Sequence, residues 1–434
     1  MSNPFTNLAR LPELKKRVWF TLFMLSIHRL GVYIPTPGID VDKIRQFLTT
    51  GTVFEFINLF SGGALDQFSI FALGIMPYIS ASIIFQLLTL SIPALKKIQE
   101  EGDAGRNKIN QWTRYATVGL ALIQGAGISY GLLNRGMALP NVDGSLFILT
   151  SMLSLATGTV FIMWLGEQIT DRGIGNGISL IIFSGIVTRM PAGMRDAWVN
   201  RDSFFGLIGF LLLLGFIFLI IATIIFFERC QRRVPIHYAK RVIGNKMYAG
   251  QTSHLPLKIN MAGVIPPIFA SSILMFPATI ASFATSEFME KVGAVLANGW
   301  INNSLYVAGI IFFTFFYTAI VFNPVDVAEN LQKHGGFVPG IRPGKPTTEY
   351  LDKIISRITL GGALYLAGLC ILPQLLINQF NVPASLATTF GGTSVLIVVG
   401  VAMDTVSQME SYLISRNYEG FLGTRSGRFK GRKG

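Results

Sequence analysis

The side chains that most often carry out chemistry are few and scattered in this sequence. The four histidines lie far apart, at His28, His237, His254 and His334. None of them belongs to a zinc-binding HExxH pattern, and the sequence contains no Walker motif for a nucleotide. Cys230 and Cys370 lack the spacing of a metal or redox pair. Asp404 is the main acid inside an apolar run, and we interpret both it and Arg29 as helix-packing or interfacial residues. The sequence therefore predicts no catalytic residues, no metal site and no cofactor.

The composition predicts a membrane protein instead. The chain has 434 residues, of which 51% are hydrophobic and only 14% are charged, and its mean hydropathy is +0.51. A soluble domain usually has about a quarter of its residues charged. Lys15, Lys16 and Arg17 precede the first apolar run, but no small-residue cleavage site follows it. We therefore interpret this run as a permanent span rather than as a signal peptide.

Apolar runs suited to crossing a bilayer, which takes a helix of about 20 residues, occur ten times along the chain. They fall at Val18–Ile34, Ile75–Ile92, Tyr115–Leu133, Leu146–Leu165, Ile174–Met190, Ser203–Phe227, Ile259–Ala284, Leu305–Phe322, Ile358–Phe380 and Gly392–Met409. Most of the 36 lysines and arginines lie in the two termini and in the loops that share their side of the membrane, chiefly 94–114, 228–258 and 326–357. By the positive-inside rule, both termini are expected in the cytoplasm.

The element that must organise the other spans is a broken apolar stretch, Ile57–Leu90. It is too long for one span. A Ser-Gly-Gly sequence and Asp66 interrupt it near its start, and Gly74 with a following proline interrupts it again. We therefore predict a short half-helix over Leu65–Leu73, followed by a full span. Broken helices at membrane depth occur only inside protein or beside a wet cavity, so the other spans should surround this one.

Two pairs of segments resemble each other across the two halves of the chain. Gly74–Ser82 matches Gly263–Ser271 at five of nine positions, and Gly177–Gly185 shares its glycines, one serine and one isoleucine with Gly392–Gly400. For either pair alone, chance similarity between apolar helices is an equal alternative. Five spans in each half is an odd number, so the halves of a duplicated chain must have opposite orientations in the membrane.

We therefore predict an all-α integral membrane protein with ten transmembrane helices in two inverted, pseudo-symmetric halves, residues 1–195 and 196–434. Isoleucines at related positions of these halves predict an apolar constriction on their common axis. They are Ile75, Ile79, Ile178, Ile182, Ile268 and Ile397. The alternative for any single one is that it faces lipid or the protein core. A ring of such side chains would exclude water and ions by dewetting.

Several strings of the sequence resemble one known family closely. They are NLFSGGAL (58–65), FALGIMPYISASI (71–83), GEQITDRGIGNGIS (166–179), NMAGVIPPIFASSI (260–273) and FVPGIRPG (337–344). These strings are typical of the SecY family, the central channel subunits of the bacterial Sec protein translocase, and the resemblance covers essentially the whole chain. It implies a channel that moves unfolded secretory polypeptides across the membrane and releases transmembrane segments sideways into lipid through a lateral gate.

The resemblance also implies roles for individual residues. The half-helix 58–73 would be a plug that closes the channel, with Ser61, Gly62, Gly63, Asp66 and Phe68. The six isoleucines fall on the positions of the family's pore ring. The lateral gate would include Ser80, Gln86, Asn260 and Phe276. The basic loops would contact a motor or a ribosome through Arg232, Arg233, Lys240, Arg241 and Arg342.

The partners that the resemblance implies are the small membrane subunits SecE and SecG, the SecA ATPase, the ribosome, signal sequences and nascent chains. The expected location is the bacterial inner membrane, with multiple spans and both termini in the cytoplasm. Two other classes stay open on the residues alone. A secondary transporter of a small solute would need a polar site at the midplane. An intramembrane enzyme would depend on Asp404.

Overall fold

The computed structural model of the chain describes residues 12–48, 61–139, 142–199, 206–238, 241–243, 246–248, 252–283, 299–380, 387 and 390–426. These residues are mostly helical and form two compact units. The first unit comprises Met1–Gly193, Ser282–Ala284 and Ile397–Gly434, and the second comprises Met194–Ala281 and Thr285–Leu396. The division into inverted halves at residue 195 stays a prediction.

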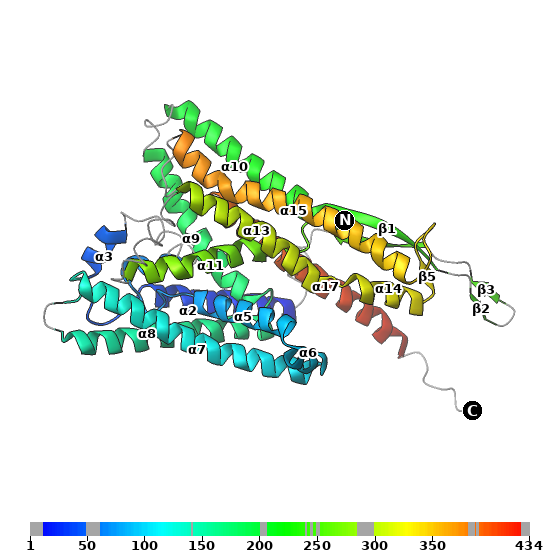
Figure 1. The fold of residues 1–434 in the computed structure, drawn as a ribbon, viewed down its shortest axis with the longest axis horizontal. Helices are drawn as coiled ribbons and strands as arrows, with labels where there is room; N and C mark the ends of the chain where they lie inside the picture. Colours follow the sequence, from blue (N-terminus) through cyan, green and yellow to red (C-terminus); the bar gives the residue numbers. More distant parts are fainter. Residues whose placement is uncertain are drawn as a thin grey trace. The chain divides into compact units, whose positions relative to one another are not determined.

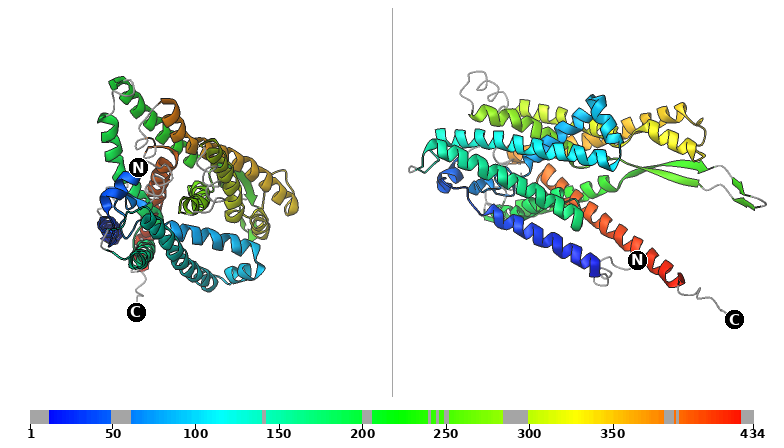
Figure 2. Two further views of the ribbon diagram at one scale, coloured as in Figure 1. Left: turned by 60° about the vertical axis from the view of Figure 1, so that its left-hand side comes forward. Right: turned by 90° about the horizontal axis from the view of Figure 1, so that it is seen from below.

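The first unit is built from helices, which are labelled in Figure 1. They are α2 (Pro12–Val32), α3 (Val41–Leu48), α5 (Met76–Ser91), α6 (Pro93–Glu100), α7 (Asp103–Asn134), α8 (Gly144–Arg172), and most of α9 (Gly177–Val199) and of α17 (Gly392–Ser426). The 3₁₀ turn η1 (Leu65–Gln67), which Figure 1 does not label, lies between α3 and α5 in the chain. Helices α7 and α8 lie side by side along much of their length, as both Figure 1 and Figure 2 show.

Small side chains explain the close packing of α7 on α8. Thr113, Thr117, Ala121, Gly125 and Ser129 recur every four residues of α7, and all are buried. Residues with this spacing share one face of a helix. Stripes of small residues let two membrane helices approach closely. Because lipid is as apolar as the helices, their association depends on van der Waals contact rather than on the hydrophobic effect.

The second unit combines helices with a small sheet. Its helices are α10 (Gly206–Arg229), α11 (Ile265–Phe283), α13 (Gly299–Val321), α14 (Pro324–Lys333) and α15 (Lys345–Phe380). Its strands are β1 (Gln231–Tyr238), β2 (Arg241–Ile243), β3 (Lys246–Tyr248), β4 (Thr252–Lys258) and β5 (Gly336–Phe337). The main sheet is antiparallel with the order β4-β1-β5, and β2 pairs with β3 as a separate hairpin.

The sheet was not expected from an all-α prediction. The pattern of β1 explains it, because Val234 and Ile236 are buried while their neighbours Arg233 and Pro235 are exposed. Such alternation is the signature of a strand with one buried face. That face packs on the start of α15, where a core forms from Val234, Leu257, Val338, Leu351, Ile354 and Ile355. Figure 1 shows β1 running beside α15.

Seven helices among the described residues are long and apolar enough to cross a membrane, and the bent pair of α5 and α6, which turns by 101°, would make eight. They confirm a multi-pass membrane protein. Two predicted spans do not meet this criterion of length and apolar composition. Helix α2 covers the first, but Lys15, Lys16 and Arg17 occupy its first turns. Helix α11 covers the seventh, of which Ile265–Leu274 is the apolar part counted. The count of ten stays a prediction.

The broken segment, defined here as residues 61–75, is less helical than predicted. The half-helix expected over Leu65–Leu73 is helical only in η1, and turns follow as far as α5. The reason is that Phe68 takes a left-handed conformation (φ 41°), which ends the helical turn. Residues 58–60 of the predicted plug lie outside the described residues.

Two glycines bring α2 and α8 against the broken segment. A Cβ added at Gly31 of α2 would collide with the ring of Phe71, and one added at Gly158 of α8 would collide with the carbonyl oxygen of Ile70. Both helices therefore touch the segment directly, and no larger residue fits at either position without movement.

We predict that Gly158→Ala destabilises the purified protein by about 1–3 kcal/mol, the usual cost of overpacking. The new Cβ forces the backbones of α8 and Ile70 apart, and a lower Tm measures the effect. Gly127→Ala is the matched control, because this α7 glycine has open space around it. There alanine should be neutral or stabilising, since it is the better helix former. Equal Tm values for the two variants would contradict the contact.

Candidate functional site

The broken segment pairs through its backbone with the residues that follow α2. Pro35 and Ser69 form an isolated antiparallel bridge. Beside it, the amide of Thr36 donates to the carbonyl oxygen of Phe68 at 2.9 Å, and the Thr36 hydroxyl donates to the same oxygen at 2.8 Å. Proline has no amide to donate, so Thr36 supplies both donors at this edge. The segment is thereby bonded to α2's end although it is not helical.

The turn around η1 is held by its own backbone and by burial. The amide of Phe68 donates to the carbonyl of Leu65, and the amide of Ser69 donates to that of Ala64, each at 2.9 Å. A left-handed residue other than glycine is uncommon. Here Phe68 is 1% exposed, so its buried ring and the hydrogen bonds of its own amide and of the Ser69 amide keep it in this conformation.

Aromatic rings clamp the second half of the segment. Phe71 stacks on His28 of α2, with ring centroids 5.7 Å apart, and on Phe161 of α8 at 6.0 Å. Trp164 extends the row from Phe161 at 5.7 Å. His28 is buried, and its Nδ1 has no hydrogen-bond partner among the residues that the structure describes. The contacts of this half are therefore mainly apolar and neutral.

The first half of the segment is held by charged side chains. Arg29 of α2 donates from Nη1 to the carbonyl oxygen of Gly62 at 3.0 Å. Arg189 of α9 lies 3.4 Å from a carboxylate oxygen of Asp66. A helix-packing or interfacial role was predicted for Arg29, and the structure adds the broken segment as its binding partner. Arg189 was not singled out, although a cation inside an apolar run is the signal that could have found it.

The six predicted ring isoleucines divide between the two units. The first unit holds Ile75, Ile79, Ile178, Ile182 and Ile397, and the second unit holds Ile268. All are buried except Ile178, which is partly exposed. Ile75 is the N-cap of α5 and the last residue of the broken segment. That these side chains form one ring stays a prediction.

Two of the predicted gate residues, Gln86 and Asn260, have hydrogen-bond partners within their own units. Ser80 is partly exposed on α5, and Gln86 donates to the hydroxyl of Ser82 at 3.2 Å. In the second unit Asn260 is buried and donates to Glu228 of α10 at 2.6 Å. The side chain of Phe276 lies outside the described residues. Glu228 was missed by sequence reasoning, because a charge at the end of a span reads as an ordinary helix terminus.

The basic loops of the second unit present exposed cations on an ordered frame. Arg232 and Arg233 are exposed on β1. Arg342 is exposed between β5 and α15, and its carbonyl oxygen accepts a hydrogen bond from the hydroxyl of Thr347 at 2.9 Å. Glycines with positive φ, at Gly340 (80°) and Gly344 (99°), shape the turn on both sides. Lys240 and the side chain of Arg241 lie outside the described residues.

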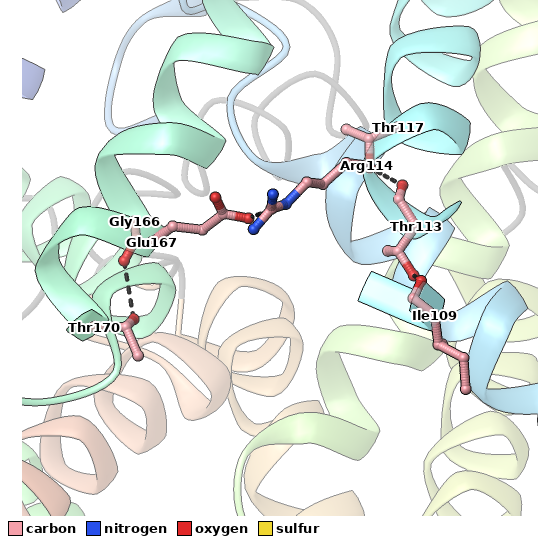
Figure 3. Close-up of polar contacts among 7 residues, drawn as sticks. All are labelled: Ile109, Thr113, Arg114, Thr117, Gly166, Glu167 and Thr170. Atoms are coloured by element: carbon pink, nitrogen blue, oxygen red, sulfur yellow. Dashed lines mark hydrogen bonds and ion pairs between the residues drawn. The ribbon is translucent and has the colours of Figure 1, made fainter. Parts of the chain in front are cut away.

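The string GEQITDRGIGNGIS forms a tight, polar connection between α8 and α9. The hydroxyl of Thr170 donates to the carbonyl of Gly166 at 2.9 Å and accepts from the amide of Gly177 at 2.9 Å. A Cβ at Gly177 would collide with that same carbonyl. Figure 3 shows Thr170 beside Gly166, and next to them Glu167, which pairs with Arg114 of α7 at 2.7 Å. These contacts hold α7, α8 and the start of α9 in place.

Comparisons with known proteins show which family the chain belongs to. The family model described as SecY matches residues 69–406. A protein translocase subunit SecY from Pseudomonas aeruginosa is 49% identical over 95% of this chain and 94% of its own. The subunit from Aquifex aeolicus is 44% identical over 97% of this chain and 100% of its own.

Two solved structures show the same fold at low identity. One is described as a protein conducting channel, with a TM-score of 0.65, 16% identity and 93% of each chain covered. The other is Sec61 in the canine ribosome-channel complex from the endoplasmic reticulum, with a TM-score of 0.62, 16% identity and the same coverage. On the family model and the identity of its relatives, this chain belongs to the SecY family.

Proposed function

We propose that this chain forms the channel of a protein translocase. It passes unfolded secretory polypeptides across the membrane and releases apolar segments sideways into lipid. The main support for this proposal is that the chain is 49% identical to a translocase subunit along nearly its whole length. It is a channel subunit rather than an enzyme, and the names of its relatives do not favour a transporter of small solutes.

The broken segment is the resting seal of this channel. Its side chains at Ala64, Leu65 and Phe68 are buried in the first unit. It ends at Ile75 and is followed on α5 by Ile79, and both isoleucines belong to the proposed pore ring. A flexible ring of apolar side chains suits many different chains, because it makes no directional bonds and stays dry when empty.

The lateral gate uses differences in transfer free energy. A Leu or Ile at the centre of a helix favours insertion into lipid by about 0.3–0.6 kcal/mol. A segment of about 20 such residues therefore leaves an opened channel for lipid, whereas a polar chain passes through. We assign Ser80, Gln86, Asn260 and Phe276 to this gate.

The driving force comes from partners that dock on the basic frame. This frame includes Arg232, Arg233 and Arg342, to which we add Lys240 and Arg241. A related fold occurs in a ribosome-channel complex, which supports a ribosome as one partner. We propose SecA as the motor and SecE with SecG as membrane subunits. The chain would lie in the bacterial inner membrane with both termini in the cytoplasm, as its basic loops predict.

Deleting Gly62–Phe68 tests the seal. We predict a higher resting ion conductance of the reconstituted translocase in planar bilayers, because the deletion removes the buried turn, while import of a preprotein into vesicles largely persists. An unchanged resting conductance, with the variant folded and inserted, would contradict the sealing role.

Replacing Ile79 with serine tests the ring. A hydroxyl at a dry constriction lowers the cost of wetting it, so we expect more ion leak and import of preproteins with defective signal sequences. Ile208→Ser on α10 is the matched control, because this isoleucine of a predicted span is 70% exposed and lies outside the proposed ring. If both variants leak equally, Ile79 does not belong to a ring.

Substitutions of Arg342 show whether this residue binds a partner or only fixes the orientation of the chain in the membrane. Arg342→Lys keeps the charge but loses the planar fork of donors that binds carboxylates and phosphates. We expect lysine to lower preprotein import several-fold and Arg342→Glu to abolish it, with normal amounts of inserted protein. Full import by Arg342→Glu would show that this arginine only sets topology.

A further inference from the structure

We propose that Arg29 and Arg189 form a two-sided latch on the first half of the broken segment, residues 61–68, and that this latch sets how readily the resting channel opens. The proposal rests on the proposed function, because it takes the broken segment as the seal. It goes further by naming the residues that hold the broken segment in place and the half of the segment that moves first when the channel opens.

The two arginines stand out because of where they lie. They are the lysine or arginine residues that fall inside the predicted spans, one in Val18–Ile34 and one in Ile174–Met190. Ionisable side chains at membrane depth are costly, and they persist where a specific partner or function requires them. Both reach the broken segment, from α2 and from α9 respectively.

On the α2 side the partner is a backbone carbonyl. Gly62 and Gly63 have positive φ values of 67° and 90°, so the chain turns sharply here and leaves the helical bonding pattern. The carbonyl oxygen of Gly62 then takes its hydrogen bond from Arg29, at 3.0 Å. Without a donor, a carbonyl at this depth would be costly to bury. Arg29 therefore favours the turned, seated conformation.

On the α9 side two residues one helical turn apart receive the segment. A Cβ added at Gly62 would lie 2.7 Å from the Cα of Gly185, so the two backbones touch. Arg189 follows four residues later on the same face of α9 and pairs with Asp66, which itself lies four residues after Gly62. The pair is 3.4 Å long, with side chains 29% (Arg189) and 40% (Asp66) exposed.

The two halves of the segment are held differently, and this predicts how it opens. Ser69 is bridged to Pro35, and Phe71 is stacked between α2 and α8, so the second half is held by neutral, buried contacts. The first half adds charged contacts, which exchange with water at lower cost when the site becomes wet. We infer that, when the channel opens, the first half moves away from α2 and α9 while the second half stays bound to α2 and α8. Phe68 lies at the junction between the two halves.

The experiment measures resting open probability in planar bilayers for the complete translocase. Asp66→Asn and Arg189→Gln should each raise it about two- to fivefold, the effect of a partly exposed ion pair. Combining them should give no further increase, because both remove one interaction. The exchanged pair Asp66→Arg with Arg189→Asp should restore the original value. Arg29→Met should raise it about tenfold or more, because it removes a charged hydrogen bond.

Salt separates an ionic latch from a general loss of packing. Screening is strong at 1 M salt, where the Debye length is about 3 Å, and weak at 0.1 M, where it is about 10 Å. The difference between the original channel and Asp66→Asn should therefore shrink at high salt. Glu167→Gln is the matched control, since it breaks the 2.7 Å pair with Arg114 shown in Figure 3, in the same unit but away from the broken segment.

The outcomes distinguish the latch from the seal. If deleting Gly62–Phe68 raises the conductance but Asp66→Asn, Arg189→Gln and Arg29→Met leave it unchanged, the seal stands and the latch is wrong. If Glu167→Gln opens the channel as much as Asp66→Asn does, the effect is not local and the latch is also wrong. If the deletion itself has no effect, the proposed seal fails first.

Discussion

The structure of this site depends on one constraint: backbone groups that leave a helix at membrane depth must find their hydrogen bonds inside the protein. The broken segment satisfies it from several directions. The amide of Ile70 donates to the carbonyl of Ile34 at 3.0 Å, and Thr36 donates twice to Phe68. Arg29 donates a hydrogen bond to the carbonyl oxygen of Gly62. Irregular backbone is therefore stable here because neighbouring elements complete its bonding.

Small residues make these bonds geometrically possible. Gly31 and Gly158 let α2 and α8 reach the segment, and Gly185 lets α9 reach Gly62. The same device joins α8 to α9, where Gly177 lies against the carbonyl of Gly166. A glycine costs conformational entropy when it is ordered. That cost is offset wherever the absent Cβ allows two backbones to touch, as they do around the broken segment.

The sequence predicts the membrane class, the break and its position, because Ser-Gly-Gly and the charge of Asp66 interrupt an apolar run. It does not predict that residues after η1 are turns, since Phe68 is left-handed only because of its surroundings. The strand β1 was missed because a short alternating pattern is weak beside long apolar helices. The partners of Arg29, Arg189 and Asn260 come from distant elements, and periodicity carries no information about such pairs.

Chemical labelling of the broken segment tests the central claim, that this segment seals the channel, most directly. Ala64 is 0% exposed in this structure, so a cysteine there, in a chain whose Cys230 and Cys370 have been replaced, should resist a membrane-impermeant thiol reagent while the channel is at rest. With a preprotein trapped in the channel, the first half of the broken segment should have left its seat, and the same cysteine should react quickly. Rapid labelling at rest, or slow labelling in both states, would contradict a segment that seals the channel and moves to open it.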